Sequence, residues 1–142
     1  RFQSMARQYY RGAHGAIVVY DVTRRNTFLK LRRWIEDVHT FSGNPYIITL
    51  MIGNKSDLSN VREVSIREAE NFAKENGINY LETSAKTSSN VQRAFDTILG
   101  DIFSLTKTSG FSTTNDLNGN DDVDLGVDVV LEQPNPPGKC SC

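Results

Sequence analysis

The stretch Ile47-Ile48-Thr49-Leu50-Met51-Ile52, followed directly by Gly53-Asn54-Lys55-Ser56-Asp57, decides how this chain is organised. The first part has the composition and length of a strand that is buried on both faces, as parallel sheets require. In open α/β sheets, ligands bind just beyond the carboxyl ends of such strands. The polar residues after the strand therefore stand where a ligand site is expected.

A second polar loop follows another short strand-like segment. Residues 79–81 are predicted to form a strand, and Glu82-Thr83-Ser84-Ala85-Lys86 comes directly after them. Because the carboxyl ends of parallel strands lie at one edge of a sheet, the two loops are expected to converge on one ligand.

The chemistry of the first loop favours guanine as that ligand. Guanine presents an N1–H and an exocyclic amine side by side, and an ionised Asp57 accepts hydrogen bonds from both. Adenine has an acceptor at N1, so the same carboxylate would be left unpaired, which costs roughly 1–3 kcal/mol or more for a charged group. Sites of this kind discriminate by ~10⁴–10⁵.

The neighbouring residues suit supporting roles. The long stem of Lys55 can lie across the face of a base while its ammonium stays in water. Asn54 both donates and accepts, so we expect it to tie its loop to nearby backbone. In the second loop, a backbone N–H near Ala85 is expected to donate to the base carbonyl, and Ser84 to brace the turn.

These two loops resemble the Asn-Lys-x-Asp and Ser-Ala-Lys elements of the Ras-superfamily small GTPases. Within that superfamily the chain resembles a Rab protein over residues 1 to about 105, with its terminal cysteines in addition. The similar segments are Arg1-Phe2, which follow the Asp-x-x-Gly-Gln-Glu switch motif in Rabs; Tyr9-Tyr10-Arg11-Gly12-Ala13 and the strand at 17–23, which follow the second switch; and Cys140-Ser141-Cys142, which matches a Cys-x-Cys prenylated ending.

The resemblance implies a three-layer α/β fold of the P-loop NTPase (Ras-like) type with a mostly parallel sheet, of which the C-terminal βαβαβα part is expected here. It implies GTP or GDP with Mg²⁺ as cofactors and GTP hydrolysis as the activity. The implied guanine-binding residues are Asn54, Lys55, Asp57, Ser84, Ala85 and Lys86.

A Rab-like protein is a switch that regulates vesicle and membrane traffic. The resemblance implies Rab effectors, exchange and activating proteins, the prenylation escort protein and the GDP-dissociation inhibitor as partners. It implies a lipid anchor on the cytoplasmic face of an intracellular membrane, with a cytosolic pool. It also places Phe2 and Tyr9 on the effector and switch surface, while Tyr10 is expected to pack inside.

The phosphate-binding motif Gly-x-x-x-x-Gly-Lys-[Ser/Thr] does not occur in this chain. We therefore expect an N-terminally incomplete sequence, cut within the second switch, whose catalytic and Mg²⁺-binding residues lie in the absent part. No residue present is assigned a catalytic or metal role. The alternative is a natural nucleotide-independent, lipid-tethered binding module derived from a Rab.

Hydrophobic periodicity predicts alternating strands and helices, which implies a parallel sheet with right-handed crossovers. Helices are expected at 1–11, at 27–40 with Asn26 or Thr27 as N-cap, from the Ser65/Glu68 capping box to Asn76-Gly77, and from Asn90 to Leu105; strands are expected at 15–20, 47–52 and 79–81. The second helix carries an apolar stripe that includes Trp34. The third is expected to bury Ile66, Ala69, Phe72 and Ala73.

The six-stranded sheet implied by the resemblance leaves one edge of this chain without its neighbours. The strand at residues 17–20 would then have an open, apolar edge, which favours aggregation. We predict that this chain alone does not fold as a stable, cooperative monomer.

Composition divides the chain into a globular part at 1–106 and a tail at 107–142. With 38% hydrophobic and 23% charged residues, the 142-residue chain is typical of a globular domain. The tail is rich in Gly, Ser, Asn, Asp and Pro, and its two lysines against six acidic residues give it a net charge of −4. That composition predicts a flexible linker. Clustered basic residues are lacking, so nucleic acid is not an expected partner.

Two features of the tail stand apart from the linker. Cys140 and Cys142 are poorly placed for a disulfide and too few for structural zinc, which takes four ligands. A pair of prenylated cysteines on a tether supplies the two signals that stable membrane anchoring needs. The apolar cluster of Val127, Val129, Val130 and Leu131 is either a docking segment for the escort protein or a chance grouping.

Overall fold

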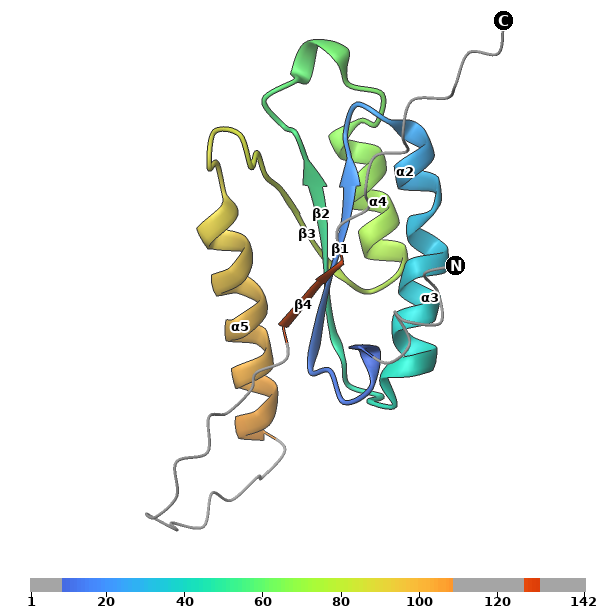
Figure 1. The fold of residues 1–142 in the computed structure, drawn as a ribbon, viewed down its shortest axis with the longest axis vertical. Helices are drawn as coiled ribbons and strands as arrows, with labels where there is room; N and C mark the ends of the chain where they lie inside the picture. Colours follow the sequence, from blue (N-terminus) through green and yellow to red (C-terminus); the bar gives the residue numbers. More distant parts are fainter. Residues whose placement is uncertain (1–8, 109–126, 131–142) are drawn as a thin grey trace, which may run out of the picture.

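The computed structural model describes residues 9–108 and, as backbone, residues 127–130 (Figure 1). Four parallel strands form one sheet in the order β3-β2-β1-β4. The strands are β1 (Gly15–Asp21), β2 (Ile48–Asn54), β3 (Asn79–Glu82) and β4 (Val127–Val130). The helices are α2 (Arg25–Leu29), α3 (Leu31–Ser42), the short 3₁₀ helix η1 (Ser59–Val61), α4 (Ile66–Glu75) and α5 (Val91–Thr108).

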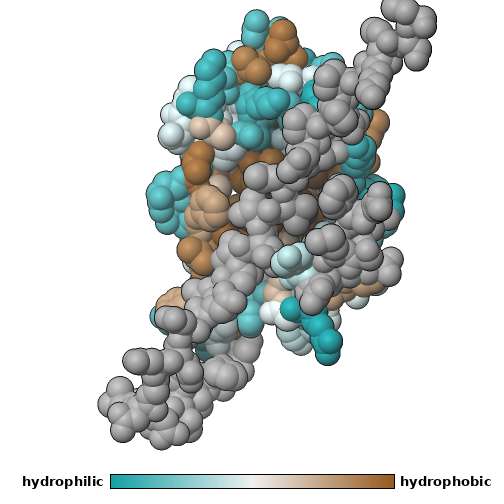
Figure 2. Space-filling model, in the orientation of Figure 1, coloured by the Kyte–Doolittle hydropathy of each residue, from teal (hydrophilic) through white to brown (hydrophobic). Residues whose placement is uncertain are grey.

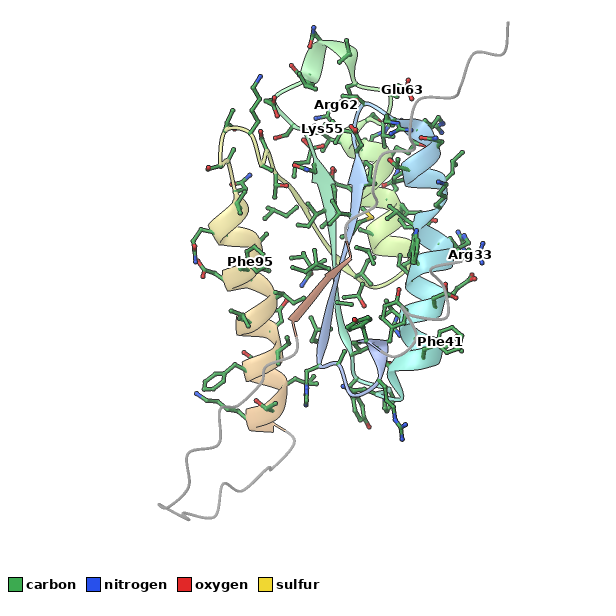
Figure 3. All side chains as sticks on the ribbon, viewed as in Figure 1. Arg33, Phe41, Lys55, Arg62, Glu63 and Phe95 are labelled. Carbon is green, nitrogen blue, oxygen red and sulfur yellow. The ribbon has the colours of Figure 1, made fainter. Side chains whose placement is uncertain are left out.

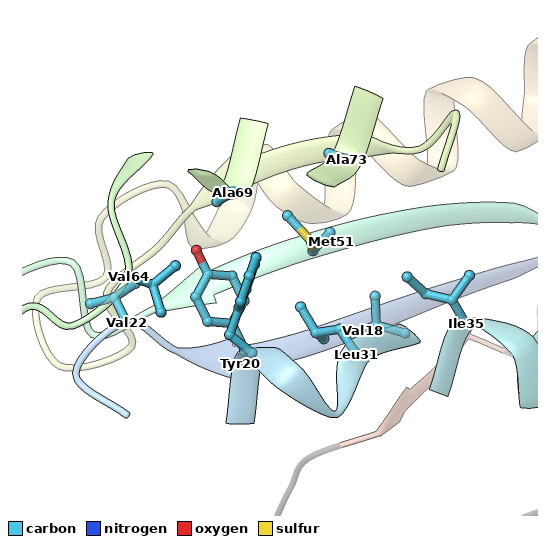
Figure 4. Packing of buried hydrophobic residues seen from close by; sticks show 10 residues of the cluster. Val18, Tyr20, Val22, Leu31, Ile35, Met51, Val64, Ala69 and Ala73 are labelled. Atoms are coloured by element: carbon cyan, nitrogen blue, oxygen red, sulfur yellow. The ribbon is translucent and has the colours of Figure 1, made fainter. Parts of the chain in front are cut away.

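Helices cover both faces of the sheet, so the structure has three layers, as predicted (Figure 1). The alternation of side chains along β2 explains this, because successive residues point to opposite faces. Met51 packs with α3 and α4, whereas Leu50 and Ile52 pack against α5. Figure 4 shows the first of these clusters, in which Met51 lies between Ala69 and Ala73 of α4 and residues of β1 and α3.

The predicted βαβαβα order is confirmed, with two changes in detail. The helix expected at 27–40 is divided into α2 and α3 at Lys30. Neither Asn26 nor Thr27 is its N-cap: Arg24 occupies that position without a side-chain hydrogen bond. Thr27 is instead buried, and its hydroxyl accepts from the Asp21 N–H at 3.0 Å and donates to the Arg24 carbonyl at 2.7 Å. It therefore fixes the turn that leaves β1.

The predicted capping of α4 is confirmed at both ends. The Ser65 hydroxyl accepts from the Glu68 N–H at 3.2 Å, and Gly77 has φ of 65°, the left-handed conformation that ends a helix. Ala69 and Ala73 are buried, but Ile66 is 49% exposed, so its predicted burial is wrong. Ile66 is the first residue of the helix and is not part of the core cluster to which Ala69 and Ala73 belong.

The edge of β1 that was expected to be open is covered along Gly15–Val18. There β4 pairs with β1 in parallel, in the register Gly15↔Val127 to Val18↔Val130. The tail therefore contributes a strand, whereas a linker was expected throughout 107–142. Helix α5 ends at Thr108, two residues past the expected end of the globular part at residue 106. Strand pairing satisfies backbone groups that the edge would otherwise expose.

Several sequence predictions fall elsewhere in the chain. Most of the helix expected at 1–11, together with Phe2, Cys140 and Cys142, lies outside the described residues. No helix in the part of the chain that the structure describes is both long enough and apolar enough to span a membrane.

Candidate functional site

The loops after β2 and β3 meet at the carboxyl end of the sheet, as the sequence predicted. Their backbones are joined directly: the Thr83 N–H donates to the Gly53 carbonyl at 2.9 Å, and the Ser56 N–H donates to the Thr83 carbonyl at 3.0 Å. In Figure 3 Lys55, Arg62 and Glu63 mark this end of the molecule, where the arrows of β1 and β2 terminate. Figure 2 shows many hydrophilic residues at the same end. A polar ligand can reach this surface from solvent.

Asn54 connects the two loops through its side chain. Its amide oxygen accepts from the Ala85 N–H at 3.2 Å and from the Thr83 hydroxyl at 3.4 Å, which confirms the predicted tie to nearby backbone. The Ala85 N–H, which was expected to donate to a base carbonyl, is therefore engaged by Asn54 in this structure. A base carbonyl at this loop has to share that N–H or displace the amide oxygen.

Ser84 holds the carboxylate of Asp57. The Ser84 hydroxyl donates to Asp57 Oδ1 at 2.5 Å and accepts from the Thr87 N–H at 3.2 Å, so it braces both the turn and the carboxylate. Ser84 is completely buried, whereas Asp57 is exposed. Because a carboxylate has about four lone-pair sites, Asp57 can still accept two further hydrogen bonds from a ligand.

Lys55 directly follows β2, and its side chain reaches the end of β1. Its backbone has φ of 67°, a left-handed conformation that costs a side-chain-bearing residue roughly 1–2 kcal/mol. Its ammonium forms an ion pair with Asp21 at 2.5 Å, while half of its side chain stays exposed. The charged end of Lys55 is thus held by Asp21 rather than left in water as expected, and contact of its stem with a base stays a prediction. The structure brings Lys86 to the same exposed loop as Ala85.

Asp21 is a member of the site that the sequence analysis did not identify. Its carboxylate accepts from the Thr23 N–H at 2.9 Å and from the Thr23 hydroxyl at 2.7 Å, besides the Lys55 ammonium. Burial by itself would raise the pKa of Asp21, but the bonds from Lys55 and Thr23 outweigh it and hold the pKa below its ordinary value. The available signal was position: Asp21 ends β1, and strand ends supply the site.

The residues present fit a purine base rather than a whole nucleotide. A held but exposed carboxylate, an amide and a lysine stem suit the edge and face of guanine. Within residues 9–108 and 127–130, no group of three or more His, Cys, Asp or Glu side chains is placed to hold a metal ion.

In a parallel α/β sheet, the edge where two polar loops meet beyond the carboxyl ends of the strands is the expected position of a ligand site. The sequence pattern of the Ras family matches residues 1–104, which is well over half of the chain, and the chain belongs to that family. Ras-family proteins are small GTPases: they bind GTP or GDP with Mg²⁺, hydrolyse GTP, and work with regulatory proteins.

The two tyrosines of the segment before β1 have opposite environments. Tyr9 is 61% exposed, whereas Tyr10 is 4% exposed and packs with Val38 and Ile47. The prediction that Tyr10 packs inside is therefore confirmed. Burial, with a smaller contribution from Asp37, raises the pKa of Tyr10 above its ordinary value. Tyr9 is free to belong to an interaction surface.

Proposed function

We propose that this protein is a Rab-type GTPase that regulates membrane traffic, with Asn54, Lys55, Asp57, Ser84, Ala85 and Lys86 as its guanine-binding residues. The observation that carries the proposal is the contact between Ser84 and Asp57, which places an exposed carboxylate where the two loops meet. Membership of the Ras family supports guanine nucleotides as the ligand. The Rab assignment rests on the tyrosine segment at 9–13 and on the Cys140-Ser141-Cys142 ending.

In this proposal the base lies with its N1–H and exocyclic amine toward Asp57. The Lys55 stem covers one face of the ring, and the second loop supplies an N–H for the base carbonyl. Asn54 keeps the two loops at a fixed separation, because it bonds to Thr83 and Ala85 at once. When bound, the nucleotide supplies the γ-phosphate whose loss switches such proteins between states.

The proposed membrane attachment uses both terminal cysteines. Cys140 and Cys142 would each carry a prenyl group, which together give the two signals that stable anchoring takes. The tail itself is acidic and adds no electrostatic attraction to anionic lipids. The protein would then be found on the cytoplasmic face of an intracellular membrane, with a cytosolic pool bound by the GDP-dissociation inhibitor. Tyr9 and Phe2 would form part of the surface that effectors contact.

Nucleotide content tests the proposal in the protein as it exists. The protein is purified from the membranes of its source cells and denatured, and the released nucleotides are separated by chromatography. We expect about one GDP or GTP per molecule, and two prenyl groups on the C-terminal peptide by mass spectrometry. A preparation that carries the lipid but no guanine nucleotide would overturn the GTPase assignment.

The second candidate is the nucleotide-independent, lipid-tethered module. It would keep the exposed Tyr9 and the two terminal cysteines for binding and anchoring, and it would need no nucleotide. The intact mass of the same preparation separates the two candidates. A mass that equals 15.9 kDa plus lipid favours the module, whereas additional mass that contains a phosphate-binding segment favours the GTPase.

A further inference from the structure

We infer that Tyr20, Tyr80, Glu82 and Arg62 form a positioning network that sets the geometry of the guanine-binding loops. The inference rests on the proposed guanine site and adds residues to it that touch no ligand. The network lies directly beneath the two loops, and its members come from β1, β3 and the segment between η1 and α4.

An ion pair between Arg62 and Glu82 connects the end of the first loop to the start of the second. The Arg62 guanidinium donates to both carboxylate oxygens of Glu82, at 2.6 and 2.8 Å, and these side chains are only 18% and 16% exposed. Arg62 follows the loop that carries Asp57, and Glu82 lies two residues before Ser84. This planar two-bond contact restricts orientation as well as distance. It therefore governs how the loop of Asp57 sits against the loop of Ser84.

Two tyrosines extend the network across β2, because Tyr20 lies in β1 and Tyr80 lies in β3. The Tyr80 hydroxyl donates to Glu82 Oε1 at 2.8 Å, and the hydroxyls of Tyr20 and Tyr80 are 3.0 Å apart. Because the Tyr80 proton is directed to the carboxylate, the Tyr20 hydroxyl donates to the Tyr80 oxygen. The order is thus Tyr20 to Tyr80 to Glu82, with Arg62 on the other side of the carboxylate. Burial is the main cause that raises the pKa of Tyr20 to about 12, so this hydroxyl stays protonated.

Gly53 couples the network to the first loop. A Cβ at Gly53 would lie 2.8 Å from the Tyr20 hydroxyl oxygen and 3.1 Å from that of Tyr80. The two hydroxyls therefore pack directly against the backbone that leads into Asn54. Glu82 also contacts the second loop through its backbone. Its backbone carbonyl accepts a hydrogen bond from the Asn90 side chain at 2.9 Å, which joins the two ends of that loop.

A second arginine–glutamate pair shows what is particular to this one. Arg25 and Glu68 also form a two-bond contact, at 2.6 and 3.0 Å, but their side chains are 49% and 35% exposed and join α2 to α4. Exposed ion pairs of this kind contribute little to the free energy of folding. Buried pairs are often no more stabilising than apolar residues of similar size, but they are directional. A role in orienting loops suits the Arg62–Glu82 pair better than a role in stability alone.

The test compares two bases in the protein expressed in its source cells. Inosine lacks the exocyclic amine that faces Asp57, so the ratio of IDP to GDP dissociation constants reports how well Asp57 is aligned. We expect Glu82→Gln and Tyr80→Phe to lower this ratio about tenfold, equivalent to the loss of one aligned hydrogen bond. Arg62→Lys retains the charge without the two-bond contact and should lower it less.

Matched controls and outcomes separate the possible failures. Glu68→Gln in the exposed pair and Tyr46→Phe at a 68% exposed tyrosine should leave the ratio unchanged. If the network variants lower the melting temperature but weaken GDP and IDP equally, the network is structural only and the inference is wrong. If the unaltered protein binds neither nucleotide, the proposed guanine site fails, and the inference that rests on it fails as well.

Discussion

The hydroxyl of Ser84 donates a hydrogen bond of 2.5 Å to one carboxylate oxygen of Asp57, and the two residues belong to different loops. The donor is completely buried and the acceptor is exposed. A buried group thus fixes the orientation of the carboxylate that we propose binds guanine. Preorganisation of this kind improves binding because the ordering is already complete before the ligand arrives.

Ser84→Ala should accelerate nucleotide release. The substitution removes a hydrogen bond to a charged acceptor, typically worth about 1.5–3 kcal/mol, and leaves the Thr87 N–H without its partner. Dissociation of a fluorescent GDP analogue should be about 10- to 100-fold faster. The control is Ser59→Ala in η1, an exposed serine whose loss should leave the rate unchanged. Equal rates for the two variants would remove Ser84 from the site.

Asp57→Asn should change the base preference of the site from guanine to xanthine. The amide offers a donor where the carboxylate offered an acceptor, and the C2 carbonyl of xanthine needs a donor. GDP affinity should fall about 10²- to 10⁴-fold, while XDP affinity should rise. Asp96→Asn is the control, since Asp96 is exposed on α5 and bonds only to Gln92 within the described part of the chain. Unchanged GDP affinity in Asp57→Asn would show that Asp57 does not contact the base.

Local sequence pattern was sufficient to predict β1, β2 and β3 and the edge at which the two polar loops meet. The largely apolar run of β2 predicts burial on both faces, and its packing against α4 on one face and α5 on the other agrees with that. The polar residues after β2 and β3 then meet because parallel strands end at one edge. The structure brings Asn54, Asp57 and Ser84 together for this reason, and their role in binding guanine stays a prediction.

Contacts between residues that are far apart in the sequence could not be predicted from local pattern. Asp21 and Lys55 are joined only because β1 and β2 pair in register, so no local motif marks the contact. The partnership of Arg62 with Glu82 likewise depends on the path of the segment after η1. The apolar cluster at 127–131 stands out in the sequence, but no local pattern shows that Val127–Val130 pairs with β1.

Gly53→Ala should destabilise the protein and loosen nucleotide binding. The new methyl group would approach the Tyr20 hydroxyl oxygen at 2.8 Å and the adjacent ring carbon at 3.0 Å, so the buried tyrosine must move. Overpacking of this kind costs about 1–3 kcal/mol. Gly100→Ala is the matched control because, apart from its chain neighbours and its own helix backbone, no described atom lies within 4 Å of the position that its methyl group would take, and alanine favours a helix by about 1 kcal/mol. The two variants should shift the melting temperature in opposite directions.

Acid should weaken the fold through Glu82. Burial alone would raise the pKa of this carboxyl, but the bonds from Arg62 and Tyr80 outweigh it and hold the pKa below 4.5. A carboxyl with a lowered folded-state pKa contributes stability above its unfolded value, and that contribution is lost as pH falls through the folded value. The urea midpoint should therefore decline below about pH 4.5. In Glu82→Gln the midpoint should be lower at pH 7 and the decline shallower; an identical decline would exclude Glu82 as its source.

The pairing of β4 with β1 can be tested by two neighbouring proline substitutions. In a parallel edge strand, alternate residues direct their backbone N–H toward the neighbouring strand, so only one of Asp128 and Val129 donates to β1. Proline removes the N–H, and edge strands tolerate it only where that group faces solvent. One of Asp128→Pro and Val129→Pro should therefore disrupt the pairing, and the other should be tolerated.

Hydrogen exchange of the β1 amides provides the measurement. The disruptive proline should accelerate exchange along Gly15–Val18, where β4 is paired, and leave amides of β2 that face β3 protected. The tolerated proline is the matched control, because it alters the same four-residue strand without removing a bond to β1. Two variants with the same exchange as the unaltered chain would show that the tail does not pair with β1. The edge of β1 would then be uncovered along Gly15–Val18, and the aggregation expected of an open edge should appear in the isolated chain.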